Sequence, residues 1–154
     1  MKKLLYLLLA LPMLLVSCND EDDLPQVKMS INYSGAATVD GELYAVQGDT
    51  IYVDSITIQP VREGKRASII SVSYYWDGWL MGVVPQPPFS ASIAVTGNKV
   101  GKHILSIQMP IVEDGCAAAT AYTSYTVNVV ASPEDIPGGG DDFGGSDTRT
   151  PTIQ

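Results

Sequence analysis

The chain has 154 residues, with nine basic and seventeen acidic side chains and a formal net charge of −8. Its basic residues form no dense patch, which excludes nucleic acid as the expected partner. Residues 27–131 hold eight acids and six bases, so this middle region is nearly neutral and the acidic excess lies toward the two ends. The middle region is long enough for one domain with its own core.

The chain begins with the pattern of a secretory signal peptide. Lys2 and Lys3 precede an apolar run, residues 4–16, that only Pro12 interrupts. Such a run rises about 20 Å as a helix, whereas a bilayer core of about 30 Å needs about 20 residues, so it is too short to span comfortably. We expect residues 1–17 to be a cleaved signal peptide; a buried core helix is the alternative.

The stretch Leu15-Val16-Ser17-Cys18 resembles the lipobox of bacterial lipoproteins. In that family the cysteine sulfur takes a diacylglycerol, the signal is cut before it, and the new amino terminus is acylated, for example with palmitate. The resemblance implies that Cys18 is a lipid anchor to a membrane, with each buried methylene contributing about 0.8 kcal/mol. A secreted protein whose cysteine only lies near the cut is the alternative.

An acidic run, Asp20 to Asp23, follows that cysteine and cannot belong to a core. Within residues 18–26 it predicts a solvated, flexible tether that an anionic membrane repels. The run also resembles the acidic export signal of surface lipoproteins of the Bacteroidetes. That resemblance implies an outer-membrane lipoprotein displayed on the cell surface.

Cys116 is the only thiol left if Cys18 carries lipid, so no intramolecular disulfide is expected. It follows the turn-like pair Asp114-Gly115, and its only possible histidine partner for nucleophilic chemistry is His103. A small residue beside a turn is the expected role.

Alternating apolar and polar residues predict short strands through the middle region. The first has its apolar residues at Val27, Met29, Ile31 and Tyr33. An extended piece, 42–46, precedes a strand over 50–58 whose inward parity changes between Val53 and Ile56. A β-bulge near Ser55 would reconcile the two halves of that strand.

The clearest strand has Ile70, Val72, Tyr74 and Trp76 on one face. Asp77-Gly78 then predicts a two-residue hairpin, because glycine accepts the positive φ that such a turn requires. The return strand, 79–84, ends at a group of prolines, which cannot donate to a ladder.

Three further strands are expected at residues 89–95, 103–109 and 121–130, each with apolar residues at alternate positions. No convincing helical period occurs over ten residues. Seven or eight short strands within residues 27–131 predict an all-β, two-sheet sandwich.

The stretches YYWDGWLMG, PQPPF and GKHILSIQM resemble the immunoglobulin-like domains carried by many Bacteroidetes surface lipoproteins. The resemblance covers residues 68–109 and extends toward Val130. It implies a single immunoglobulin-like domain with Trp76 as the core tryptophan of the third strand. The chain lacks the paired cysteines of antibody domains, which leaves its strand order open.

Residues 132–154 are rich in Gly, Pro, Asp, Ser and Thr, with isolated apolar residues at Ile136, Phe143 and Ile153. Burial of so few apolar groups cannot repay the entropy of ordering, which predicts a disordered tail. Its aspartates lack the ligand spacing and terminal glutamate of an EF-hand, so we expect no metal site there.

Catalysis is not expected. His103 shares its parity with Leu105 and Ile107, which favours a structural role, and no two carboxylates within the domain are placed by the sequence as an acid/base pair. Nor does any motif call for a cofactor.

Binding is the expected function. Tyr75 and Trp79 flank the Asp77-Gly78 turn, where outward-facing rings can stack on a glycan or contact an apolar protein partner. The sequence therefore predicts a non-enzymatic binding or adhesion module on the outer surface. The alternative is a structural spacer or assembly subunit whose free strand edges recruit a partner strand, or less readily an accessory of a carbohydrate-active enzyme.

Overall fold

A computed structural model of the chain describes residues 23–95, 97–139 and 143–154. The expectations for the signal peptide, for lipidation of Cys18 and for the acids Asp20 to Asp22 lie outside the described residues. Within the described ranges, no helix has both the length and the apolar character needed to cross a membrane.

Twelve strands and one short 3₁₀ helix, η3 (Pro133–Asp135), make up the described chain. The strands are β1 (Val27–Ser34), β2 (Ala37–Val39), β3 (Glu42–Val46), β4 (Thr50–Pro60), β5 (Ala67–Ile69), β6 (Val72–Trp76), β7 (Trp79–Val84), β8 (Ala91–Ala94), β9 (Gly101–Glu113), β10 (Ala119–Val130), β11 (Gly144–Arg149) and β12 (Thr152–Ile153).

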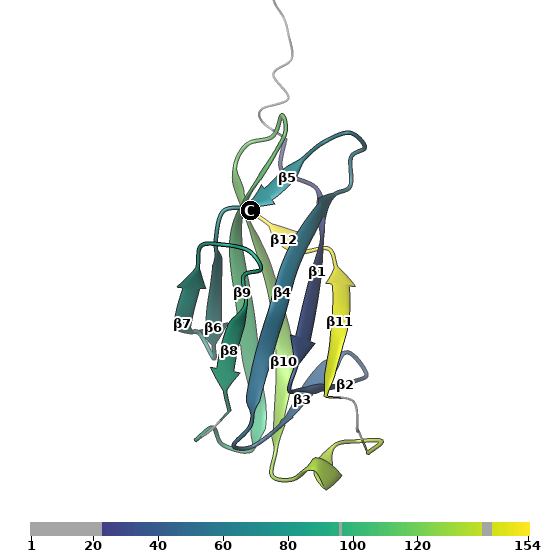
Figure 1. Ribbon diagram of the computed structural model, residues 1–154, viewed down its shortest axis with the longest axis vertical. Coiled ribbons are helices and arrows are strands. Elements are labelled where there is room, and N and C mark those ends of the chain that lie inside the picture. Colours follow the sequence, from purple (N-terminus) through teal and green to yellow (C-terminus); the bar gives the residue numbers. More distant parts are fainter. Residues whose placement is uncertain (1–22, 96, 140–142) are drawn as a thin grey trace, which may run out of the picture.

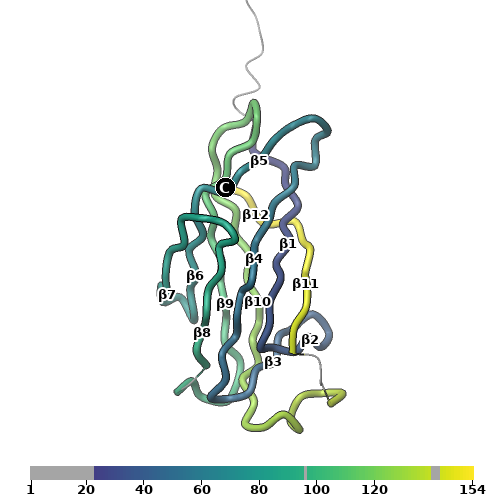
Figure 2. Tube along the Cα trace, in the orientation of Figure 1, coloured from purple at the N-terminus to yellow at the C-terminus, as the bar shows by residue number. Residues whose placement is uncertain are grey.

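The strands form two facing sheets whose strands run along the long axis of the domain (Figures 1 and 2). Sheet A has the order β11-β1-β4-β8, and sheet B has the order β2-β3-β10-β9-β6-β7, with β5 also on β9 and β12 also on β10. Neighbours pair antiparallel except β3 and β10, which are parallel. A β1-β4-β8 sheet facing a β10-β9-β6-β7 sheet is an immunoglobulin-like arrangement, and it answers the question of strand order.

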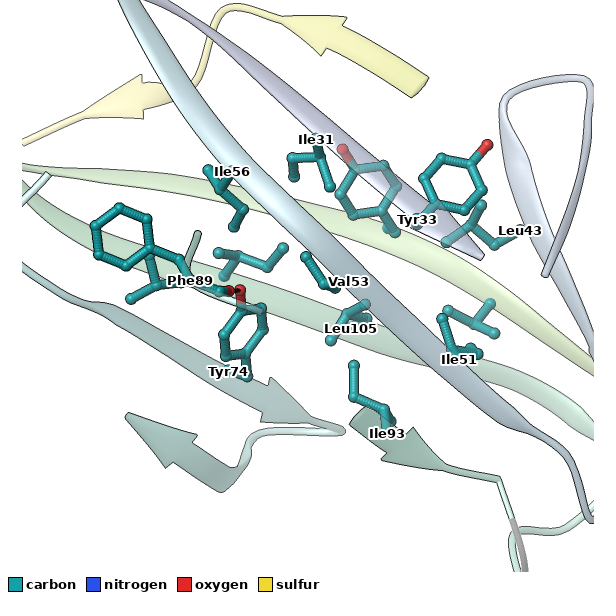
Figure 3. Close-up of a cluster of buried hydrophobic side chains, with 14 of the residues drawn as sticks. Ile31, Tyr33, Leu43, Ile51, Val53, Ile56, Tyr74, Phe89, Ile93 and Leu105 are labelled. Carbon is teal, nitrogen blue, oxygen red and sulfur yellow. Dashed lines mark hydrogen bonds between the residues drawn. The ribbon is translucent and has the colours of Figure 1, made fainter. Parts of the chain in front are cut away.

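The core lies between the sheets and takes side chains from both (Figure 3). Ile31 and Ile56 from sheet A meet Tyr74 and Leu105 from sheet B, and all four are buried. The hydroxyl of Tyr74 donates to the carbonyl oxygen of Phe89, so this buried hydroxyl has a partner. A continuous apolar interior of this kind replaces any need for a disulfide.

The period-two prediction is confirmed in β1 and β4. Inward residues of β1 are buried at every second position. In β4, Val53 and Ile56 are both buried, and the pairing with β1 skips Asp54. This β-bulge lies next to Ser55, where the change of parity required one.

Ile70 is a correction to the predicted strand around Trp76. Its side chain is 54% exposed, because β5 ends at Ile69 and β6 begins only at Val72. The partner strand β9 contains Pro110 at this point, which has no N–H to donate to the ladder. The resulting irregularity turns Ile70 outward while Val72, Tyr74 and Trp76 stay inward.

The C-terminal segment is the larger correction, because it is not a disordered tail. Its strand β11 pairs with β1 at the edge of sheet A, and its strand β12 pairs with β10 in sheet B. Ile136 is buried, so one of the isolated apolar residues serves as an anchor. The order comes mainly from backbone pairing, which satisfies N–H and C=O groups without requiring apolar side chains.

Of the expected tether, residues 18–26, the structure describes residues 23–26. These four residues lie against the domain: Asp23 forms an ion pair with Arg62 at 3.4 Å, and the amide of Gln26 donates to Glu113 at 2.7 Å. The carbonyl of Asp23 also accepts from the Ala117 amide at 3.1 Å. Ordered contacts therefore begin before β1.

Candidate binding site

The β6–β7 hairpin turns through Asp77 and Gly78, as predicted. Both residues have positive φ, 48° and 83°, which matches a two-residue turn of the kind that follows the twist of its strands. Asparagine, aspartate and glycine tolerate this backbone best, so within this hairpin the Asp77-Gly78 pair determines where the turn forms.

Asp77 ties this turn to the neighbouring strand β9. One oxygen of its carboxylate accepts from the Ile104 amide at 2.9 Å, and the other accepts from Nδ1 of His103 at 2.7 Å. The second ring nitrogen of His103 donates to the Lys99 carbonyl at 2.7 Å, and the ring stacks on Trp76 with centroids 5.2 Å apart. These contacts hold the imidazole ring between the β6–β7 turn, the Lys99 carbonyl and Trp76.

Both partners of His103 are acceptors, so only the protonated ring can donate to both at once. The hydrogen bond to Asp77 accordingly raises the pKa of His103, and the Lys99 carbonyl adds to the effect. Partial burial would raise the pKa of Asp77, but the hydrogen bonds from His103 and Ile104 outweigh it and hold that pKa below its ordinary value. The pair holds the hairpin in place.

The two candidate rings, Tyr75 and Trp79, do not form one platform. Facing residues of a hairpin point to the same side, and the register pairs Trp79 with Trp76 and Leu80 with Tyr75. Trp79 thus projects on the inner side of the ribbon, beyond the core, and is 80% exposed. Tyr75 is half-buried on the outer face of sheet B.

Trp79 instead belongs to a row of exposed apolar side chains on its own strand. Leu80, Met81 and Val83 are each more than half exposed, and β7 carries no charged residue. We call the four side chains the β7 edge. A bulge at Met81, where the register to β6 shifts, spreads them over both sides of the strand.

The β7 edge also offers unpaired backbone. Strand β7 is the last strand of sheet B, so in the described chain one side of it pairs with β6 and the other with no strand. Sequence reasoning found Trp79 but missed Leu80, Met81 and Val83. The available signal was the uncharged run WLMGVV between a turn and a group of prolines.

Cys116 lies in a polar cluster with Arg62 and Glu113. Its sulfur is 3.3 Å from a guanidinium nitrogen of Arg62 and 3.7 Å from the carboxylate of Glu113. Partial desolvation and the nearby Glu113 raise the pKa of the Cys116 thiol above its ordinary value, which favours the poorly nucleophilic protonated form. Arg62 and Glu113 also hold the segment before β1, so the cluster fixes the entry of the chain into the domain.

Asp147, one of the aspartates of the C-terminal segment, has partners within the protein. It accepts from the Tyr125 hydroxyl at 2.8 Å and forms an ion pair with Arg149. Among the described residues, no three acidic, histidine or cysteine side chains come together as a metal site would require. Asp141 and Asp142 lie outside the described residues.

Comparisons with known proteins add little to this geometry. No protein-family model matches the sequence, and no curated protein matches it. Among solved structures, the fibronectin(III)-like modules of CbhA from Clostridium thermocellum are similar, with a TM-score of 0.40 and 18% identity over 61% of this chain and 92% of that one. This likeness is too distant to assign a family.

Proposed function

We propose that the protein is a non-enzymatic binding module of the bacterial envelope, anchored by lipid on Cys18, that binds a partner protein through the β7 edge. The partner would add an extended segment to β7, so that its backbone pairs with the free side of the strand. Its apolar side chains would cover Trp79 and Val83.

The observation that carries the proposal is the exposure of four large apolar side chains on an unpaired, uncharged strand. Soluble proteins normally protect such an edge with charge, proline or a covering segment, because it otherwise pairs with other chains. Aromatic residues are also the commonest source of binding energy in protein interfaces. A strand left in this state is best explained by a partner that covers it.

The absence of catalysis is part of the proposal. In its support, both ring nitrogens of His103 are engaged with Asp77 and Lys99, and partial desolvation and Glu113 raise the pKa of the Cys116 thiol, which favours its protonated form. Neither group is poised as a base or a nucleophile.

The anchor and surface display rest on the sequence. The lipobox-like stretch before Cys18 and the acids after it support an outer-membrane lipoprotein of the kind found on the surface of Bacteroidetes. Cys18→Ser cannot form the thioether, so this variant should leave the detergent phase in a partitioning experiment. A mature-sized variant that still enters detergent would contradict lipidation.

The binding proposal is tested by photo-crosslinking from within the β7 edge. A crosslinking amino acid at Val83, in cells that produce the full chain, should trap a protein partner. The same group at Tyr52, which is about half exposed on sheet A, is the matched control. Equal products from both positions, or none from Val83, would contradict binding at β7.

The same free edge also favours a second function, that of an assembly subunit whose copies pair through β7. If the product trapped from Val83 is another copy of the chain, the protein is an assembly subunit of a surface structure. If a different protein is trapped, adhesion or binding is the function. Sizing the product by mass spectrometry separates the two.

A further inference from the structure

A second surface of sheet B has a different chemistry from the β7 edge. An open groove of about 420 Å³ lies over β9 and β10, a volume within the range of small-ligand sites. The Ile107–Thr123 pair of the two strands lines its floor, where Ile107 contributes main chain because its side chain is buried in the core. We call this feature the sheet B groove.

The register places polar side chains at the four corners of that floor. Ser106 faces Ser124, and Gln108 faces Tyr122, all on the outer face of the sheet. Hydroxyl and amide groups both donate and accept hydrogen bonds, so these corners can serve a ligand with many hydroxyls. The Tyr122 ring adds a flat apolar surface beside them.

Tyr75 extends the same row. It faces Ser106 across β6 and β9, and Ser106 in turn faces Ser124. Tyr75 and Tyr122 therefore lie on the same face of the sheet, separated by serine and glutamine side chains. Two rings with hydrogen-bonding groups between them match the alternation of apolar ring faces and hydroxyls along a sugar chain.

The C-terminal segment supplies the remaining wall, and among the described residues that line the groove it carries the single charged one, Arg149. Arg149 is already engaged: it pairs with Asp147, donates to the Ser124 carbonyl at 3.1 Å, and lies 4.0 Å over the ring of Tyr125. Its charge is thus neutralised within the fold. An anionic ligand would find no unpaired cation here.

We propose that the sheet B groove binds a neutral oligosaccharide, with Tyr122 and Tyr75 stacking on sugar rings and Gln108 and Ser106 bonding to hydroxyls. This site adjoins the β7 edge, because Leu80 faces Tyr75 across β6 and β7, but it does not depend on the partner proposed for that edge. The correction to the C-terminal segment is what completes it, because a disordered tail would leave the groove without its Arg149 side.

The experiment titrates the full chain, purified in detergent, with defined hexasaccharides of glucose, mannose and xylose and with acidic polygalacturonate, using calorimetry. At least one neutral hexasaccharide should bind, and Tyr122→Ala should weaken it at least tenfold. Tyr122→Phe, which keeps the ring, should retain most of the affinity. Tyr52→Ala, on sheet A, and Val83→Lys, on the β7 edge, should leave it unchanged.

Circular dichroism of each variant checks folding, and Gln108→Ala provides a second test at a smaller side chain, with an expected loss of several-fold. No binding to any neutral sugar, binding of polygalacturonate alone, or equal binding by Tyr122→Ala would overturn the proposal. If Val83→Lys loses sugar binding and Tyr122→Ala keeps it, the sugar binds at the β7 edge. This result would also overturn the proposal.

Discussion

Strands β7 and β11 each lie at one end of a different sheet, and their compositions are opposite. Strand β11 reads GGSDTR and ends sheet A, whereas β7 reads WLMGVV and ends sheet B. Polar and charged side chains on an edge discourage further pairing, and apolar ones invite it. The contrast indicates that the β11 end of sheet A is protected against further pairing and that the β7 end of sheet B is open to it.

The two edges are also held differently. Strand β11 fits closely on β1, since a Cβ on Gly145 would lie 2.6 Å from the Tyr33 hydroxyl oxygen, and Asp147 binds the Tyr125 hydroxyl of the opposite sheet. Strand β7 has a bulge in its pairing with β6, and a Cβ built on its Gly82 would meet no atom of the described chain beyond its two sequence neighbours within 4 Å. Strand β11 is packed against the rest of the fold, whereas the side chains of the β7 edge are exposed.

The largest difference in stability should be found between alanine variants of the two tryptophans of the hairpin. Trp76 is buried against His103, so Trp76→Ala should cost about 3–5 kcal/mol of unfolding free energy. Trp79→Ala should cost under about 1 kcal/mol, because that ring is already in water. Urea unfolding of the two variants measures both values. Equal losses would make Trp79 part of the core and remove the β7 edge as a site.

A matched pair of glycines compares the two edges directly. Gly145→Ala in β11 forces Tyr33 to move and should cost about 1 to 3 kcal/mol. Gly82→Ala in β7 meets no atom within 4 Å and should stay within about 0.5 kcal/mol of the parent. Thermal unfolding followed by circular dichroism is sufficient. If Gly145→Ala is neutral, β11 is not packed as closely as described.

The Asp77–His103 pair should make the β7 hairpin sensitive to pH. Because the folded pKa of His103 is raised, its contribution is present below the unfolded value of about 6.5 and lost as pH rises through the folded pKa. The folded pKa of Asp77 is lowered, so its contribution is present above about 3.9 and lost as pH falls through the folded pKa. Asp77 is partly exposed, so we expect a change under about 1 kcal/mol.

Urea unfolding from pH 4 to 9 should therefore show greater stability between about 4 and 6.5 for the parent than for Asp77→Asn. The difference should shrink above the folded pKa of His103. A constant difference over the whole range would mean that the carboxylate acts only through the Ile104 amide.

A lysine at Val83 should have the smallest effect on stability and a clear effect on association. Val83→Lys places a charge on the open edge and should change stability by no more than about 0.5 kcal/mol, while blocking strand addition. Ser146→Lys, on the exposed surface of β11, is the control and should block nothing. Sedimentation velocity at rising protein concentration measures self-association of the two variants. Photo-crosslinking from Met81 measures their capture of a partner. Loss of the partner in both variants would contradict a role confined to β7.

The fold was largely predictable because its strands obey a period of two, including the parity change at Ser55. The C-terminal segment was not, since its order depends on backbone pairing with β1 and on contacts to Tyr33 and Tyr125, which lie far away in the sequence. Composition measures how much apolar surface a segment can bury, and it does not register these interactions.

The candidate site was half predictable. Trp79 comes directly after the turn, and its exposure agrees with that position. Its separation from Tyr75 follows from hairpin geometry, in which the residues flanking a two-residue turn face each other and the next pair points to the other side. The sheet B groove needed the register of β6, β9 and β10, which no local pattern supplies.

The contacts before β1 have a mechanical consequence. With Asp23 and Gln26 fixed to the domain, a lipid on Cys18 would be separated from Asp23 by four intervening residues, and the five steps between them reach about 17 Å. A pull between that lipid and a partner on β7 would then load β1 along its length. The hydrogen bonds of β1 to β4 and β11 lie across this direction and would share the force, so the strand would resist shear along two ladders rather than peel from one.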